Sequence, residues 1–431
     1  MKKKLLTLFL VILLSACSTK KPVPGIRKEV FLNNSSIEVK GNLNNITIPQ
    51  AKTFKNYYGD GSTLNLNIEN YKVDNFDFIS NKISRMRFSE KIYFSSSPIV
   101  VDNNIYFLDT RGNLISRNLD TNKNSWKTKV VEKSNIPNYY GGKISYYNGN
   151  LYLTTRLNEV ISVSSTDGII NWRKKLNTIP ISAPVIENTT IYVITNDNKL
   201  YALDSNDGRI KWISFGNPKN SAILGSANPV IYKNYVIASY SSGELFILNK
   251  ETGENIFNTN ITGKYMIYSN FELTDIDSTP VIVDNILIAT ANNGVATAIN
   301  LDTMRIIWKQ NLPSITNILK SNATIYLMTT DNILISLDAT NGKIYWSIQF
   351  DRFKNMKKKK DLVFYSSIAM INGKVYAFNN NNEYKIINPK NGELEKTTEM
   401  DLLLYSIPFS LNNKLYAIGR NGRTIYFVNT K

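Results

Sequence analysis

The sequence predicts an all-β fold, a β-propeller of eight four-stranded blades, and a recurring hairpin is the main reason. Residues 200–212 alternate side chains with the period of a strand, turn at Asp204-Ser-Asn-Asp-Gly208 and continue to Trp212. The first turn residue of this pattern recurs at steps of 38 to 51 residues, at Asn118, Ser164, Asp204, Asn249, Asn300, Asp338, Asn388 and Asn429. A repeat of about 40–50 residues built from short strands is the signature of a propeller.

Two further observations support this fold class. All five tryptophans occupy the same position of the repeat: Trp126, Trp172, Trp212, Trp308 and Trp346. Each repeat also has two more strand patterns upstream, as at residues 182–186 and 190–194, which makes four strands per unit. Proline precedes or opens the first strand in several units, where its missing N–H costs least. We therefore interpret each unit as one blade.

The two ends of the repeat array complement each other. Residues 83–88 resemble the fourth strand of a blade but precede the first complete unit, whereas the last unit, residues 407–429, ends before its own fourth strand. We expect the N-terminal strand to pair into the C-terminal blade and close the ring, because closure removes open sheet edges. Seven complete units and this composite give eight blades.

The N-terminus carries an export signal. Lys2 to Lys4 precede an apolar run at residues 5–14, which is too short to span a membrane. Leu14-Ser-Ala-Cys17 follows and resembles a bacterial lipobox, which implies cleavage before Cys17 and a diacylglyceryl group on its thiol. The alternative is an ordinary signal peptide with an accidental cysteine. Ser18, rather than aspartate, after the cysteine implies export to the outer membrane.

These features divide the chain into three parts. We expect a signal peptide at residues 1–16, a lipidated tether and lead-in at 17–75, and the propeller at 76–431. The lead-in has turn signals but no blade pattern, and it should lie across the propeller surface or stay loose.

Composition excludes several kinds of chemistry. The chain has no histidine, which excludes a histidine general base or metal ligand, and its one cysteine cannot form an internal disulfide. The formal charge of +17 favours anionic partners such as acidic lipids or acidic proteins. Alternatively, the charge is spread over a solvated surface and has no specific partner. The export signal argues against nucleic acid as a partner. The run Lys357 to Lys360 has the same two interpretations, so it is not counted as a site.

The repeat, with its Leu-Tyr-Ala-Leu-Asp strand, Asp-Gly turn and tryptophan, resembles the propeller repeat of pyrroloquinoline-quinone enzymes. The resemblance implies that the turn glycine and the tryptophan dock neighbouring blades. Those enzymes carry an adjacent cysteine pair over the cofactor and a carboxylate-bound calcium. This chain has a single cysteine and no acidic cluster with calcium-ligand spacing, so we expect no cofactor, no metal, no catalytic residue and no enzymatic activity.

A lipoprotein with eight such blades resembles the BamB family of the outer-membrane β-barrel assembly machinery. That family has an Asp-x-Asp-x-Thr-Pro stretch between blades four and five, and Asp275 and Asp277 match it. The resemblance implies that these aspartates bind the periplasmic POTRA domains of BamA. Two carboxylates two residues apart on an extended segment face the same way and can bind one basic or N–H group. Alternatively, they cap a turn before the next strand.

A second family contact loop lies between blades three and four. Ile223 matches an apolar position there, and Leu224 stands where the family often has arginine, which implies an altered or weaker contact; both residues could instead pack within the loop. The resemblance as a whole implies a monomer within a hetero-complex, anchored in the outer membrane and facing the periplasm. The alternative is an envelope lipoprotein that binds polysaccharide or another envelope ligand, and a vestigial quinone enzyme is a third possibility.

Overall fold

The computed structural model describes residues 37–39, 41–59, 70–74, 84–87, 97–109, 111–131, 142–218, 227–262, 276, 278–292, 294–314, 316–400, 408–418 and 424–428. The chain divides into two units, Met1–Asn34 and Ser35–Lys431, and every described residue belongs to the second. Apart from one 3-10 turn, η1 (Leu43–Asn45), the regular elements of the described part are strands. None of its helices has the length and apolar character needed to cross a bilayer.

The first four sheets follow the chain in order. The first contains β3 (Ile99–Val101), β4 (Asn104–Leu108), β5 (Asn113–Asn118) and β6 (Asn124–Lys129). The second contains β7 (Gly142–Tyr147), β8 (Asn150–Thr155), β9 (Glu159–Ser164) and β10 (Ile170–Lys175). The third contains β11 (Val185–Glu187), β12 (Thr190–Ile194), β13 (Lys199–Asp204) and β14 (Ile210–Phe215). The fourth contains β15 (Val230–Tyr232), β16 (Tyr235–Ser239), β17 (Glu244–Asn249) and β18 (Asn255–Asn260).

The remaining sheets continue this order. The fifth contains β19 (Val281–Val283), β20 (Ile286–Ala289), β21 (Ala296–Asn300) and β22 (Arg305–Gln310). The sixth contains β23 (Leu319–Ser321), β24 (Thr324–Met328), β25 (Ile333–Asp338), β26 (Ile344–Gln349) and β1 (Ile37–Val39). A small hairpin, β27 (Phe353–Asn355) and β28 (Lys360–Leu362), precedes the seventh, which contains β29 (Tyr365–Ile371), β30 (Lys374–Asn379), β31 (Glu383–Ile387) and β32 (Leu394–Glu399). The last contains β33 (Phe409–Leu411), β34 (Lys414–Ile418), β35 (Thr424–Val428) and β2 (Ser84–Arg87).

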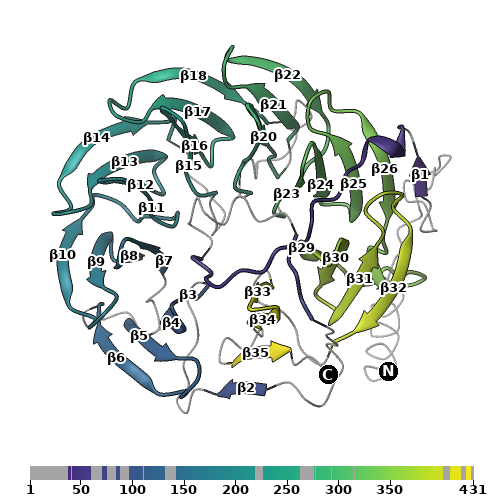
Figure 1. The fold of residues 1–431 in the computed structure, drawn as a ribbon. Coiled ribbons are helices and arrows are strands. Elements are labelled where there is room, and N and C mark those ends of the chain that lie inside the picture. The colour runs from purple at the N-terminus through teal and green to yellow at the C-terminus, as the bar shows by residue number, and fades with distance from the viewer. Residues whose placement is uncertain are drawn as a thin grey trace, which may run out of the picture. The chain divides into compact units, whose positions relative to one another are not determined.

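Within this unit, the sheets succeed one another in chain order around a common centre, with the first strand of each sheet innermost (Figure 1). Neighbouring strands are antiparallel, and the connection from each outer strand leads to the inner strand of the next sheet. This is the architecture of a β-propeller. The all-β prediction is therefore confirmed.

The hairpin on which the prediction depended is present between β13 and β14. Ala202 lies opposite Trp212, and a bulge follows at Leu203. Residues of the turn itself stabilise it, because the Asp204 carboxylate accepts a hydrogen bond from the backbone N–H of Asn206 at 2.9 Å. Gly208 has a φ of +73°, a conformation that glycine adopts without a steric penalty.

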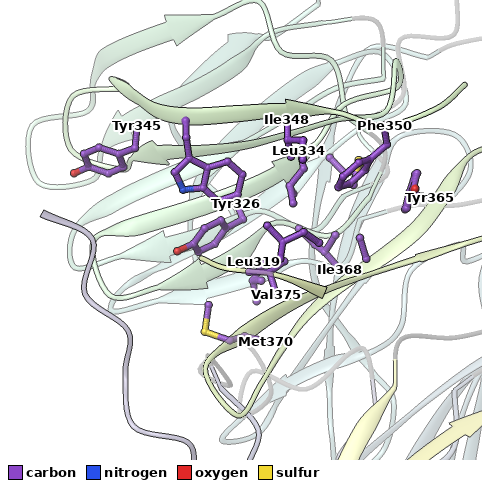
Figure 2. Packing of buried hydrophobic residues seen from close by; sticks show 14 of the residues in the cluster. Leu319, Tyr326, Leu334, Tyr345, Ile348, Phe350, Tyr365, Ile368, Met370 and Val375 are labelled. Carbon is purple, nitrogen blue, oxygen red and sulfur yellow. The ribbon is translucent and has the colours of Figure 1, made fainter. Parts of the chain in front are cut away.

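The core consists of apolar layers between successive sheets. In the layer between the sixth and seventh sheets, Leu319, Tyr326 and Ile348 approach Ile368 and Met370 (Figure 2). Each sheet contributes residues to a layer on either side, because alternate residues of a strand point to opposite faces. Burial between sheets, rather than within one sheet, therefore holds neighbouring sheets together.

The N-terminal strand β2 pairs antiparallel with β35, from Ser84 opposite Phe427 to Arg87 opposite Thr424. This pairing between the two ends of the repeat array is the one that the sequence predicted. Hydrogen bonds across it join segments more than 330 residues apart in the sequence, so the last sheet depends on both ends.

The lead-in packs against the sheets and adds a strand to one of them. β1 pairs with β26 as the fifth strand of the sixth sheet, with Ile37 opposite Ile348 and Val39 opposite Trp346. In Figure 1 the following segment runs from β1 across the sheets toward β3. There Tyr57 exchanges backbone hydrogen bonds with Val100, and its ring stacks on Phe409 at a centroid distance of 4.0 Å.

Candidate partner-binding site

Five residues that the sequence singled out lie outside the described part of the structure. They are the lipidation site Cys17 and the partner-contact residues Ile223, Leu224, Asp275 and Asp277. The residues that flank both contact segments are described, however, and they fix where the segments begin and end.

The structure brings the ends of the two contact segments together. The backbone N–H of Ala227, which follows the first segment, donates to the carbonyl of Ile276 at 3.3 Å. Ile276 is the residue between the two aspartates. The next N–H, of Asn228, donates to the Thr279 hydroxyl at 3.1 Å. Two segments about 50 residues apart in the sequence therefore meet at one place beside the fourth sheet.

Ile276 points into the core of this part of the propeller. It is 2% exposed and packs in the apolar layer between the fourth and fifth sheets, with Ala227 and Val230. Asn228 joins this region to the preceding sheet, because its side-chain oxygen accepts a hydrogen bond from the backbone of Ala183 at 2.8 Å. The described residues beside the contact segments are thus held by three sheets.

The start of the first contact segment is held equally firmly. The carbonyl of Asn217 accepts a hydrogen bond from the Asn198 side chain at 2.7 Å, and its N–H donates to Glu244 at 2.9 Å. Asn198 is fully buried, and its side-chain oxygen also accepts from the N–H and the hydroxyl of Ser241, at 3.1 and 2.8 Å. One asparagine therefore joins the third and fourth sheets beside Asn217, close to the start of this segment in the sequence.

A buried tyrosine also lies near this junction. The Tyr240 ring is fully buried beside Ser241, and burial raises the pKa of its phenol well above the ordinary value. The group stays neutral across physiological pH and supplies packing. In the described part of the chain, no three His, Cys, Asp or Glu side chains are grouped so that they could hold a metal ion.

The tryptophans form repeated contacts between neighbouring sheets. Each indole N–H donates to a turn carbonyl of the following sheet at 2.9–3.2 Å: Trp126 to Ser165, Trp172 to Ser205, Trp212 to Lys250, Trp308 to Ala339 and Trp346 to Pro389. Each ring also lies against the turn glycine of that sheet, so that an added Cβ would come within 2.6–2.8 Å of it: Gly168, Gly208, Gly253, Gly342 and Gly392.

Two turns have another residue in place of this glycine, and both follow a sheet without the tryptophan. Met304 has a φ of +53° and follows the fourth sheet, where Phe257 occupies the tryptophan position. Asn122 has a φ of +54° and follows the sheet that contains β2. Phe257 and Met304 both pack against the same apolar layer. In the described turns, glycine therefore occurs where a tryptophan of the preceding sheet packs against it.

Comparison with known proteins gives the evolutionary context. A family model described as outer membrane protein assembly factor BamB matches residues 137–348, which include both contact segments. The BamB of Salmonella typhimurium is 31% identical over 261 residues, covering 60% of this chain and 67% of that protein. The chain belongs to the BamB family. The BamB of Escherichia coli K12 is 30% identical over 259 residues, covering 59% of this chain and 66%, just under two thirds, of that protein.

Solved structures agree with this fold. The crystal structure of BamB from Moraxella catarrhalis matches with a TM-score of 0.65 at 18% identity, covering 80% of this chain and 98% of that one. A europium-containing methanol dehydrogenase matches with a TM-score of 0.61 at 12% identity, covering 84% of this chain and 89% of that one. At these identities the likeness shows only a fold, which this chain shares with a BamB protein and with a methanol dehydrogenase.

Sequence reasoning missed the asparagines that hold the contact segments in place. Asn198 and Asn228 look like ordinary polar loop residues, yet each bonds to a neighbouring sheet. A signal for Asn198 does exist: asparagine recurs two residues before the third strand pattern at Asn158, Asn332 and Asn382, each with a positive φ. This regularity indicates a turn position with a fixed backbone requirement.

Proposed function

We propose that this protein is a non-catalytic scaffold of outer-membrane protein assembly that binds the periplasmic POTRA domains of a BamA-like barrel assembly protein. The observation that carries the proposal is the BamB family match over residues 137–348, because this range includes both predicted contact segments. Its relatives are named outer membrane protein assembly factors. The same relationship supports a role without catalysis, although the fold is shared with dehydrogenases.

The scaffold of the proposal is an eight-bladed ring. The described residues form seven four-stranded sheets and one five-stranded sheet, apart from the small β27–β28 hairpin. Pairing of β2 with β35 places the N-terminal strand in the sheet of the C-terminal strands, which supports closure of the ring in the way the sequence predicted. A closed ring gives the contact segments a rigid support.

The proposed contact consists of Asp275 and Asp277, with Ile223 and Leu224 beside them. For this contact both carboxylates must be accessible to the partner, on either side of the buried Ile276. Two adjacent carboxylates would then accept hydrogen bonds from a basic side chain or from backbone N–H groups of the partner. Leu224, where the family often has arginine, would leave this contact more dependent on the aspartates and on apolar burial.

The proposal includes a lipid anchor. After removal of residues 1–16, a lipidated Cys17 would hold the chain at the outer membrane, with the propeller facing the periplasm. More than one acyl chain makes such anchoring stable, at about 0.8 kcal/mol per buried CH₂. Mass spectrometry of the protein purified from its own membrane tests this part separately.

A pull-down tests the partner assignment. Residues 18–431, which retain the compact unit Ser35–Lys431, are mixed with the periplasmic domains of the BamA-like protein from the same organism. The parent should bind, and the Asp275→Ala/Asp277→Ala variant should lose most of the binding. The matched control, Glu251→Ala/Glu254→Ala, removes two exposed carboxylates from the outer turn of the fourth sheet and should bind like the parent.

Each other outcome has a distinct meaning. Binding by both the parent and the aspartate variant would keep the role and move the interface elsewhere. Absence of binding by the parent would contradict the proposal and favour a propeller that binds another envelope ligand. Circular dichroism of each variant shows whether it remains folded.

A further inference from the structure

The β27–β28 hairpin concentrates positive charge at one exposed turn. Residues 352–362 contain six basic residues and one acidic residue. Arg352 pairs with Asp331 at the base of the hairpin, with 3.1 Å between Nη1 and Oδ1. The side chains of Lys357 to Lys360 are exposed at the turn, which Asn355 organises by accepting a hydrogen bond from the N–H of Lys358 at 3.0 Å. The charge therefore lies at the tip of an ordered hairpin.

Two asparagines attach the base of this hairpin to the sheets on either side. Asn332, in the sixth sheet, is 3% exposed and donates to the carbonyls of Asp351 and Val363 at 3.0 and 2.8 Å. Asn380, in the turn that follows β30, donates to the carbonyl of Leu362 at 3.0 Å. It also accepts from the N–H of Phe364 at 3.0 Å. The hairpin is thus fixed to the propeller at its base.

Large apolar side chains lie exposed beside these lysines. Leu362 is 56% exposed and Phe364 is 52% exposed, whereas Val363 between them is 5% exposed and packs in the core. The core contact of Val363 directs its two neighbours outward, as expected for an extended segment. A cluster of lysines next to an exposed leucine and phenylalanine has the chemistry of a membrane-interface site, where lysines meet anionic headgroups and apolar side chains enter the acyl boundary.

The direction of β1 also bears on a membrane-interface role for this hairpin. Ile37, the first residue of β1, lies opposite Ile348 near the end of β26, and β27 begins at Phe353. The chain therefore enters the sixth sheet at the end from which the hairpin leaves. The lipid anchor proposed above therefore joins the sixth sheet, along the chain, through the strand end at Ile37 from which the lysine-bearing hairpin also leaves. This second argument rests on that anchor, whereas the charge and the apolar side chains do not.

We propose that the β27–β28 hairpin is a membrane-docking site that binds anionic phospholipid headgroups through Lys357, Lys358 and Lys360, with Leu362 and Phe364 entering the interface. A bilayer interface offers anionic headgroups directly beside an apolar acyl region, which matches lysines next to an exposed leucine and phenylalanine. Docking at this edge would restrict how the propeller sits on the membrane. The site is separate from the contact segments beside the fourth sheet.

Vesicle flotation tests this site without acylation or any protein partner. Residues 18–431 are mixed with vesicles of phosphatidylethanolamine and phosphatidylglycerol, and with vesicles of phosphatidylcholine alone. The parent should bind the anionic vesicles, and added salt should weaken the binding. Lys357→Gln/Lys358→Gln/Lys360→Gln should reduce partitioning about 100-fold, because each lysine near an anionic surface contributes roughly a fivefold effect. Lys359 is left in place so that the variant removes three charges, as the control variant below does.

The matched control removes three exposed lysines elsewhere. Lys123→Gln/Lys127→Gln/Lys309→Gln carries the same net charge as the hairpin variant and should stay within about threefold of the parent, since these residues lie away from the docking site. Binding that persists at high salt should come from the apolar side chains, so a Leu362→Ser/Phe364→Ser variant should lose it. Equal loss in both lysine variants would show diffuse attraction and overturn the proposal.

Two further results would also overturn it. One is no binding of the parent to anionic vesicles; the other is unchanged binding by the hairpin variant. Capture of soluble polyglutamate in place of vesicles would indicate an acidic protein partner instead. Because the assay contains no barrel assembly protein, its failure is distinguishable from failure of the proposed scaffold function.

Discussion

Adding one methyl group at Gly392 should destabilise the propeller through the contact between the sixth and seventh sheets. Gly392 has a φ of +76°, and a Cβ there would come within 2.6 Å of Cε3 of Trp346. Trp346 is fully buried, and its indole N–H donates to the carbonyl of Pro389 at 2.9 Å. The ring cannot move aside without losing this hydrogen bond and its packing.

The magnitude follows from two separate costs. A left-handed conformation costs a residue with a Cβ about 1–2 kcal/mol. Overpacking a well-packed core typically costs a further 1–3 kcal/mol. Gly392→Ala should therefore lower the free energy of unfolding by about 2–5 kcal/mol, measured by urea unfolding followed by circular dichroism.

The chain provides a control with the same backbone conformation. Gly149 also has a φ of +76°, but an added Cβ there would have no atom within 4 Å. Gly149→Ala should therefore cost only the conformational part, about 1–2 kcal/mol. The difference between the two variants isolates the tryptophan contact. Equal destabilisation would refute the view that tryptophan and glycine dock neighbouring sheets.

Two further predictions concern buried polar groups. Asn198→Ala should cost about 3 kcal/mol, because it removes three hydrogen bonds, two of them to Ser241 beside the fourth sheet, each contributing about 1 kcal/mol. Urea unfolding beside the exposed-turn variant Asn148→Ala checks this, and equal costs would contradict it. Burial tends to raise the pKa of Asp338, but hydrogen bonds from Thr340, Tyr345 and Asn341 outweigh it and hold the pKa below its ordinary value. The stabilisation is therefore present above the unfolded-state pKa of about 3.9 and is lost as the pH falls through the folded-state value. Asp338→Asn should lower the urea midpoint of unfolding at pH 7. The midpoint of the variant should also fall less steeply than that of the parent as the pH drops below about 4. Plots of midpoint against pH that run parallel for the two proteins would contradict this.

The sequence could predict the sheets because their signals are local. Residues 200–212 show strand alternation, an Asx turn and a glycine within one short window, and the structure has the corresponding hairpin. Repetition of that window then predicted the propeller. The pairing of β2 with β35 was also predictable, since an extra strand at one end matched a missing strand at the other.

Two elements could not be predicted in the same way. Pairing of β1 with β26 joins Ile37 to Ile348, and nothing local to residues 37–39 indicates this partner, because the contact is set by tertiary structure. The β27–β28 hairpin lies in a lysine-rich stretch for which the sequence predicted no strands. Its strands are three residues each and are held by Asn332 and Asn380 from neighbouring sheets.

The candidate site depends on a sequence motif and on contacts that only the structure shows. Asp275 and Asp277 were found only through the resemblance to a family motif, since two aspartates near a proline also fit an ordinary turn. The structure adds that Ala227, which follows the first segment, is hydrogen-bonded to Ile276, which lies between the two aspartates. That meeting depends on the stacking of whole sheets, which a local sequence pattern does not contain.

The central claim is that this chain supports assembly of outer-membrane proteins, and depletion in its own organism tests it most directly. The amounts of folded β-barrel proteins in the outer membrane are measured in cells that lack the chain, then in cells that again produce the parent or the Asp275→Ala/Asp277→Ala variant. We predict that the amounts fall without the chain, recover with the parent and stay low with the variant at equal protein level. Unchanged amounts of folded β-barrel proteins in cells that lack the chain would contradict the claim.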